Sequence, residues 1–109
     1  MTQTPRPRLA YHHTQGDGPT IVFLPGYASD MKGAKALALE AWARRAGRAF
    51  LRFDYGGCGQ SEGAFEEQTL AGWRDDVVAM LDQIATGPVV LIGSSMGGWL
   101  MLLAAKARP

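Results

Sequence analysis

The sequence predicts an α/β layered fold built on parallel strands, because three short strand-like runs alternate with stretches of helical periodicity. The runs are residues 20–24, 48–53 and 89–92. The first of them is continuously apolar and rich in β-branched residues, the pattern of a strand buried on both faces of a sheet. Parallel pairing of such strands requires right-handed crossovers, and the chemistry of such sheets lies at the carboxyl ends of the strands.

The residues before the first of these runs are expected to be peripheral. Residues 1–8 are predicted to be flexible, and residues 8–15 could form a short strand. The cluster Gly16-Asp17-Gly18-Pro19 has the composition of a turn and is expected to separate that strand from the run at 20–24.

A first helix is predicted between the strands at 20–24 and 48–53. Ser29 or Asp30 can cap its N-terminus, and Gly47 is expected to end it. Its apolar positions fall at helical spacing and are Leu39, Trp42, Ala43 and Ala46. We expect the Trp42 ring to pack in or near the core.

A second helix is predicted to open at Thr69 and to close at Gly87-Pro88. One apolar stripe of this helix comprises Trp73, Val77, Met80, Leu81 and Ile84. Three carboxylates are expected to lie mostly off this stripe, namely Asp75, Asp76 and Asp82.

Residues 54–63 are too rich in glycine for helix or strand and are predicted to form a long surface loop. We expect Asp54 to play a structural role, such as accepting hydrogen bonds from loop amides. Cys58 is expected to be a small filler rather than a reactive thiol, because no cation lies beside it in sequence. Residues 99–107 are apolar nearly all round, which predicts a helix packed inside a larger protein.

The composition is that of a globular protein and excludes several partners. Of the 109 residues, 47% are hydrophobic and 19% are charged, with a net charge of +1. Lys and Arg are scattered, so nucleic acid is not expected as a partner. A single cysteine cannot form an internal disulfide, and His12-His13 would need further ligands to hold a metal, so no metal or organic cofactor is expected. The oligomeric state is left open.

The location is predicted to be cytoplasmic. The N-terminal residues have no apolar segment typical of a secretory signal, and no later stretch has the length of a membrane span.

The motif that carries chemistry is Gly93-Ser94-Ser95-Met96-Gly97, which matches Gly-x-Ser-x-Gly between a predicted strand and a predicted helix. A sharp turn at that place holds the middle residue in a strained conformation, so the residues two positions before and after it must be small. Gly93 and Gly97 meet this requirement. It also raises the Ser95 hydroxyl above the sheet, at the N-terminus of the following helix. We therefore predict that Ser95 is a nucleophile.

A serine that attacks an acyl group needs two N–H donors for the oxyanion, and the N–H of Met96 is predicted to be one of them. The second is expected from the turn that follows residues 20–24. Pro25 has no N–H, so Gly26 and Tyr27 remain, and we favour Tyr27. The alternative, a phosphate-binding turn, would require Gly-x-x-x-x-Gly-Lys-Ser/Thr or Gly-x-Gly-x-x-Gly, which residues 93–98 do not provide.

Four segments together resemble the α/β-hydrolase family, namely Leu24-Pro-Gly-Tyr27, residues 52–61 (Arg-Phe-Asp-Tyr-Gly-Gly-Cys-Gly-Gln-Ser), Trp73-Arg-Asp-Asp76 and residues 93–99. The likeness is greatest to the subgroup of palmitoyl-protein thioesterases and acyl-glucuronide esterases, whose best-known member is mitochondrial. It implies the N-terminal half of an α/β-hydrolase fold, a mostly parallel sheet with flanking helices in which the strand ending at Leu24 lies between the other two.

The resemblance further implies a serine esterase or thioesterase that cleaves acyl esters or thioesters, or acylated proteins, through an acyl-enzyme. In this family a later Asp orients a still later His that acts as the general base. Only His12 and His13 are present, both before Ser95, and no His, Asp or Glu follows it. We therefore expect residues 1–109 to be the N-terminal part of a single domain, nearly inactive by itself.

Two other functions remain open at this point. A non-catalytic binding or interaction domain could retain a hydrolase scaffold without its chemistry. Another branch of the same fold, a peptidase or a dehalogenase, is the second possibility, although dehalogenases normally use Asp as the nucleophile where this chain has Ser95.

Overall fold

The structure is a computed structural model and describes residues 9–26, 30–85 and 87–108. Its elements, in chain order, are β1 (Tyr11–Thr14), β2 (Asp17–Leu24), α1 (Ala34–Arg45), β3 (Arg48–Phe53), the short 3-10 helix η1 (Phe65–Glu67), α2 (Leu70–Gln83), β4 (Val89–Gly93) and α3 (Met96–Ala107). The predicted flexible residues 1–8 lie outside the described part of the chain.

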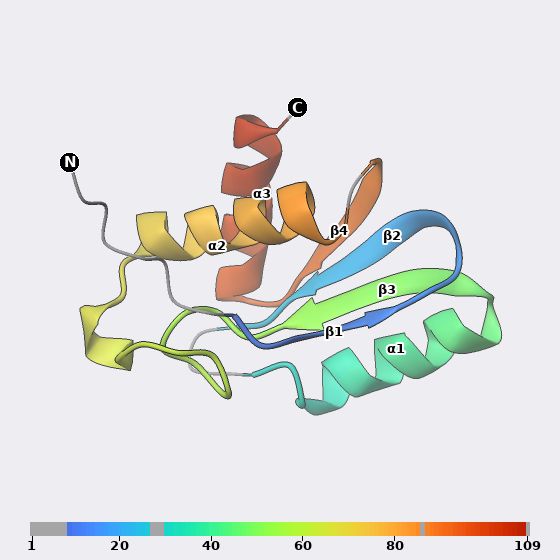
Figure 1. Cartoon of the computed structure of the whole chain (residues 1–109), viewed down its shortest axis with the longest axis horizontal. Coiled ribbons are helices and arrows are strands. Elements are labelled where there is room, and N and C mark those ends of the chain that lie inside the picture. The colour runs from blue at the N-terminus through green and yellow to red at the C-terminus, as the bar shows by residue number, and fades with distance from the viewer. Residues whose placement is uncertain (1–8, 27–29, 86, 109) are drawn as a thin grey trace.

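The four strands form one sheet in the order β1-β3-β2-β4. β2 pairs in parallel with both β3 and β4, whereas β1 runs antiparallel to β3. Helix α1 covers one face of the sheet, and α2 and α3 lie on the other (Figure 1). The predicted mostly parallel sheet with flanking helices is thus confirmed, as is the central place of the strand that ends at Leu24.

The alternation of side chains along β2 builds a separate core on each face of the sheet. Val22 and Leu24 belong to the larger core, which contains buried residues of α2 and α3. Ile21 and Phe23 point to the other face and pack with Ala36 and Ala43 of α1, among others. The central strand therefore has no solvent-facing side, which explains its continuous apolar sequence.

Two predicted boundaries are wrong. Residues 17–19 were expected in a turn, but β2 already begins at Asp17, whose Cα pairs with that of Arg48 before an irregularity in the register. The predicted cap Asp30 does not begin α1 either, because its carboxylate accepts from Lys32 N in a turn and Gly33 occupies the N-cap position. The other candidate cap, Ser29, lies outside the described residues.

Helix α2 begins as predicted, with Thr69 as N-cap and its hydroxyl accepting a hydrogen bond from Gly72 N at 3.0 Å. The predicted stripe is buried at Trp73, Val77 and Met80. Asp76 was expected off the stripe, but it is only 6% exposed. Its carboxylate accepts a hydrogen bond from Gly56 N, in the segment after β3.

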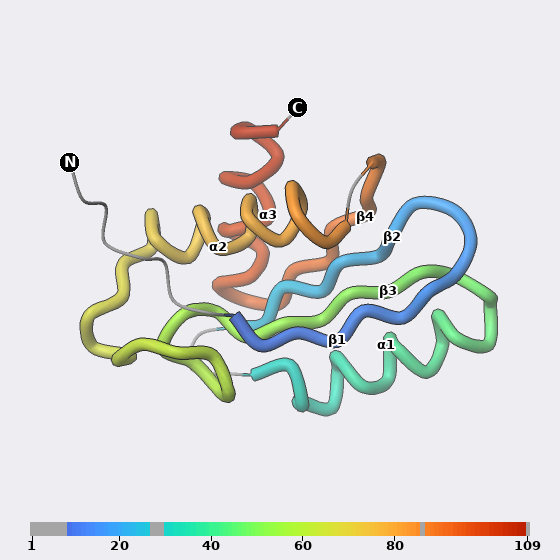
Figure 2. Tube along the Cα trace, viewed as in Figure 1, coloured from blue at the N-terminus to red at the C-terminus, as the bar shows by residue number. Residues whose placement is uncertain are grey.

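The connection from β3 to α2 passes the carboxyl end of the sheet (Figure 2). It was predicted to be a surface loop, but residues 54–56 and Cys58 are buried, and only the later residues reach the surface. The backbone of this segment forms hydrogen bonds with side chains of the connection itself and of α2. It can therefore be buried without leaving these polar groups unpaired.

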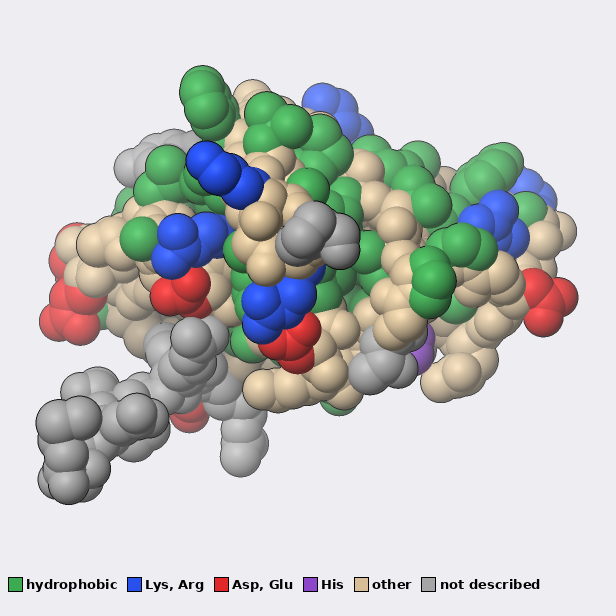
Figure 3. All heavy atoms as spheres, turned by 90° about the horizontal axis from the view of Figure 1, so that it is seen from above, with side chains coloured by type: hydrophobic (Ala, Val, Ile, Leu, Met, Phe, Trp, Pro, Cys, Tyr) green, Lys and Arg blue, Asp and Glu red, His purple; other side chains and the backbone are tan. Residues whose placement is uncertain are grey.

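Large apolar side chains remain exposed on both sides of the molecule. Trp42 is 47% exposed, which contradicts its predicted core position and follows from its place on the outer side of α1. On α3, Trp99 and Leu102 are 67% and 61% exposed. Figure 3 shows many apolar side chains at the surface of the face that carries α2 and α3, in keeping with the prediction that this last helix belongs inside a larger body.

Strand β4 is only partly buried, and its Val90 is 42% exposed. Among the described residues β4 pairs only with β2, so it forms an edge of the sheet. Within residues 9–26, 30–85 and 87–108, no helix has the length and apolar character that crossing a lipid bilayer requires.

Candidate active site

The chain turns sharply from β4 into α3 at Ser95. This residue has φ 55° and ψ −117°, and among the described residues it is the one non-glycine residue with positive φ. Such a conformation costs about 1–3 kcal/mol and persists only where the surrounding structure imposes it. The Ser95 side chain is exposed and makes no capping hydrogen bond to α3, so its hydroxyl is presented to solvent at the helix N-terminus.

Close backbone packing imposes this bend and explains the glycines that flank the serine. A Cβ on Gly93 would overlap the carbonyl group of Gly97. A Cβ on Gly97 would overlap the carbonyl oxygen of Leu24 and would lie 2.8 Å from that of Pro25. Helix α3 can therefore approach the end of β2 only where side chains are absent.

The carboxyl ends of β2 and β4 lie next to each other at this bend. Leu24 pairs with Gly93, and Ser94 N donates to the carbonyl oxygen of Leu24 at 3.1 Å. No acceptor among the described residues binds the N–H of Met96, which starts the first turn of α3. Tyr27, the favoured second oxyanion donor, lies outside the described residues, so that assignment remains a prediction.

Two neighbouring hollows open beside the bend, and both are lined by Phe23, Lys35 and Ser94. The one that reaches Ser95 has a volume of about 530 Å³. Its remaining lining residues are mostly apolar and comprise Ala38, Leu39, Ile92 and Gly93.

Asp54, directly after β3, plays the structural role predicted for it. The carboxylate is 1% exposed and accepts hydrogen bonds from Met31 N at 2.7 Å and from Gln60 N at 2.9 Å. The carbonyl of Met31 in turn accepts from Nη1 of Arg52 at 3.1 Å. Residues at the end of β3 thus bind both the N–H and the carbonyl of Met31, between β2 and α1.

Cys58 is buried, which agrees with the prediction that it fills space in the interior rather than acting as a reactive thiol. Burial raises the pKa of its thiol, and the nearby carboxylates of Asp54 and Asp76 raise it further. The group therefore stays protonated and poorly nucleophilic.

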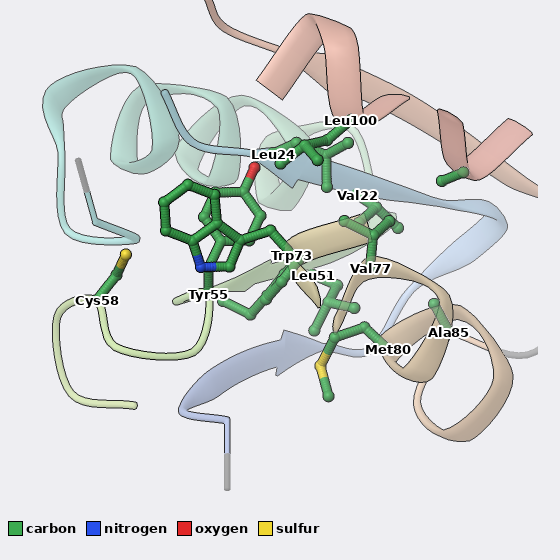
Figure 4. Close-up of a cluster of buried hydrophobic side chains, with 12 residues drawn as sticks. Val22, Leu24, Leu51, Tyr55, Cys58, Trp73, Val77, Met80, Ala85 and Leu100 are labelled. Atoms are coloured by element: carbon green, nitrogen blue, oxygen red, sulfur yellow. The ribbon is translucent and has the colours of Figure 1, made fainter. Parts of the chain in front are cut away.

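Tyr55 binds the chain directly after β2. Its buried hydroxyl donates to the carbonyl oxygen of Pro25 at 2.8 Å. Figure 4 shows its ring among the core side chains. The centroids of the Tyr55 and Trp73 rings are 5.9 Å apart. Burial raises the pKa of this phenol far above its ordinary value, and the neighbouring Cys58 and Asp76 add to the effect.

Tyr55→Phe is expected to destabilise the full-length protein by about 1–3 kcal/mol near neutral pH, because the Pro25 carbonyl loses its buried donor. Since the folded-state pKa of Tyr55 is raised, the stability that its protonated hydroxyl contributes is complete below about pH 10 and declines above it, by at most about 1.4 kcal/mol per pH unit. Urea denaturation of the wild type and Tyr55→Phe between about pH 8 and 11 should show that the difference in their free energies of unfolding decreases as pH rises. A difference that is constant or grows with pH would refute this reading.

Three side chains that contact this region were not predicted from the sequence. Asp76 accepts from Gly56 N at 2.9 Å, and Trp73 Nε1 donates to the carbonyl of the same glycine at 2.9 Å, so α2 fixes the segment after β3. Their spacing of three residues on one helix face was the available signal. Lys35, whose Nζ lies 3.2 Å from Ser94 Oγ, gave no signal, because residues 59 positions apart meet only through the fold.

A strained, exposed serine between a parallel strand and a helix, at the carboxyl end of the sheet, defines the class of the α/β hydrolases. The chain belongs to the alpha/beta hydrolase family, whose sequence model matches residues 21–108.

Among curated proteins, the chain is 54% identical over 103 residues to the human palmitoyl-protein thioesterase ABHD10, mitochondrial. The match covers 94% of this chain and 34% of the human protein, so the chain spans about a third of that relative's length. It is also 34% identical to the mouse sn-1-specific diacylglycerol lipase ABHD11, over 93% of this chain and 33% of that protein.

Solved structures confirm the fold. The alpha/beta hydrolase domain-containing protein 10 from mouse superposes with a TM-score of 0.95 at 50% identity, covering 100% of this chain and 44% of the mouse chain. A putative hydrolase from Agrobacterium vitis gives a TM-score of 0.87 at 39% identity, covering 93% of this chain and 41% of its own.

The predicted cytoplasmic location is contradicted by these relatives. The human, bovine and mouse proteins of 50–54% identity are all named as mitochondrial. The prediction failed because it relied on the absence of a secretory-type apolar segment, a test that does not detect mitochondrial targeting sequences, which are amphipathic and rich in Arg and Ser.

Proposed function

We propose that the full-length protein is a serine hydrolase that cleaves acyl thioesters or carboxylic esters through an acyl-enzyme on Ser95. The observation that carries this proposal is the backbone of Ser95, which is held at positive φ with its hydroxyl exposed. A purely structural turn would be more stable with glycine at this position, so the presence of serine favours a chemical role over a non-catalytic binding domain.

In the proposed reaction Ser95 Oγ attacks the acyl carbonyl and its proton passes to a general base. The tetrahedral oxyanion accepts from the N–H of Met96 and from a donor in the turn after β2, for which Tyr27 is favoured over Gly26. The bond to the leaving group breaks, and the departing thiolate or alkoxide takes up the proton. Water then attacks the acyl-enzyme with the same base, releasing the acid and restoring Ser95.

The base and its orienting acid are proposed to be a His and an Asp outside residues 1–109, because this chain spans about a third of its human relative's length and has no His, Asp or Glu after Ser95. Chains of this fold place the nucleophile first, then the acid, then the His. No metal or organic cofactor has a role in this scheme.

The substrate class is proposed from two observations. The hollow that reaches Ser95 has an apolar wall suited to an acyl chain. The relatives of 50–54% identity are named palmitoyl-protein thioesterases, which favours a long-chain acyl thioester, free or on a protein, over an amide or halide.

The test is thiol release from palmitoyl-N-acetylcysteamine by the full-length protein, followed with a thiol reagent on the millisecond scale. We expect a burst of about one thiol per enzyme if deacylation is slower than acylation, and no release above background from Ser95→Ala. Release by the Ser95→Ala protein at the wild-type rate would refute the proposal, and so would the absence of any turnover of thioesters and p-nitrophenyl esters by the wild type.

A further inference from the structure

Lys35 lies over the hollow that contains Ser95. It is the second residue of α1, and its Nζ is 3.2 Å from Oγ of Ser94, the residue before the proposed nucleophile. Its side chain lines both hollows at the bend. A group that enters either hollow therefore meets this ammonium.

Among the described residues, Lys35 is the one charged residue that lines the hollow reaching Ser95. The neighbouring hollow, of about 290 Å³, also has Asp30, whose Oδ1 already accepts from Lys32 N. None of the ion pairs formed within the described ranges involves Lys35. The hollow beside Ser95 thus has a mostly apolar wall and one positive charge, which forms no ion pair with a carboxylate of the described residues.

The position of Lys35, in the first turn of α1, does not stabilise the helix. The first turn has no acidic residue, and a cation there faces the positive end of the helix macrodipole, whereas Arg44 and Arg45 occupy the favourable last turn. A charge placed against local stability beside a reactive group is better explained by a ligand than by folding.

We propose that Lys35 is a specificity-determining residue that favours acyl substrates with an anionic group, such as a carboxylate, close to the scissile bond. This inference rests on the proposed function of Ser95. The ammonium attracts the anion electrostatically and leaves the chemical step to Ser95, so it acts on kcat/KM. The anionic group can belong to the acyl part or to the leaving group, and the substrates below separate the two sources.

The experiment uses two matched pairs of thioesters with the full-length protein. In the first pair the butyryl thioesters of 3-mercaptopropionate and of 3-mercaptopropionamide differ by a charge on the leaving group. In the second, adipoyl and adipamoyl thioesters of N-acetylcysteamine differ by a charge on the acyl part. We expect kcat/KM for the anionic member of one pair to exceed that of its neutral partner about fivefold at low ionic strength, and the ratio to fall with added salt.

Substitutions at Lys35 test whether this side chain causes the preference for the anionic thioester. Lys35→Met should bring the ratio to about one, Lys35→Glu should invert it, and Lys35→Arg should keep it. Lys32→Met is the matched control: Lys32 is also exposed but lines neither hollow, so the ratio should remain that of the wild type.

The outcomes separate this inference from the function on which it rests. Hydrolysis of the neutral thioesters that depends on Ser95 but shows no preference for either anionic member overturns the role of Lys35 alone. A preference that survives Lys35→Met overturns it as well. The absence of Ser95-dependent hydrolysis of all four thioesters overturns the proposed function itself.

Discussion

Ser95→Gly in the full-length protein is expected to abolish acyl hydrolysis and at the same time to raise the free energy of unfolding. Removal of the nucleophile should lower kcat on the order of 10⁶-fold, equivalent to about 8 kcal/mol of transition-state stabilisation. Glycine tolerates φ 55° and ψ −117°, so the strain of about 1–3 kcal/mol is relieved. Because glycine also loses more chain entropy on folding, the net gain should be about 1 kcal/mol.

Ser95→Ala is the matched control for this prediction. Alanine removes the hydroxyl but keeps the Cβ, so it should lose as much activity as Ser95→Gly without the gain in stability. Urea denaturation and steady-state kinetics of the three proteins give both quantities. A Ser95→Gly protein less stable than Ser95→Ala would show that the bend at residue 95 is not strained.

The second large effect is expected at Gly97. In Gly97→Ala the new methyl group would overlap the carbonyl of Leu24, an atom of the central strand that cannot move without disturbing its pairing with β3 and β4. We expect a loss of about 3 kcal/mol or more in the free energy of unfolding. Activity should fall as well, because a shift of α3 displaces the N–H of Met96 from the end of β2.

Gly98 provides the comparison within the same helix turn. A Cβ at this position has no atom within 4 Å, so Gly98→Ala should be neutral or stabilising by up to about 1 kcal/mol, the difference in helix propensity. Thermal or urea denaturation of the two variants tests the close approach of α3 to β2. Equal stability of Gly97→Ala and Gly98→Ala would contradict it.

The sequence predicted the parallel strands and the bend because both depend on local patterns. The limits of β3 at Arg48 and Phe53 and the cap at Thr69 agree with the structure. The serine turn could be located because Gly-x-Ser-x-Gly between a strand and a helix reflects a local steric requirement.

The errors arose where tertiary contacts outweigh local composition. Residues 17–19 have turn chemistry but extend β2, because Asp17 N donates to the carbonyl of Gly47 and aligns this segment with β3. Asp76 carries a charge and still lies inside, since its carboxylate accepts from Gly56 N. Residues 54–56 and Cys58 belong to a glycine-rich loop yet are buried, because side chains of the loop and of α2 bind its backbone. Periodicity contains no information on such contacts.

The candidate site was predictable only in part. Ser95, Met96 and the two glycines follow from one motif, whereas the contact of Lys35 with Ser94 and the bond from Tyr55 to Pro25 join residues 59 and 30 positions apart. Contacts at such separations are set by the order of strands in the sheet.

The central claim is that the hydroxyl of Ser95 is the activated nucleophile. The most direct test is to treat the full-length protein with a fluorophosphonate probe and to map the modified residue by peptide mass spectrometry. We predict a single adduct on the peptide that contains Ser95, none on Ser94, and no labelling of Ser95→Ala. Labelling that persists in Ser95→Ala, or an adduct mapped to another residue, would contradict the account.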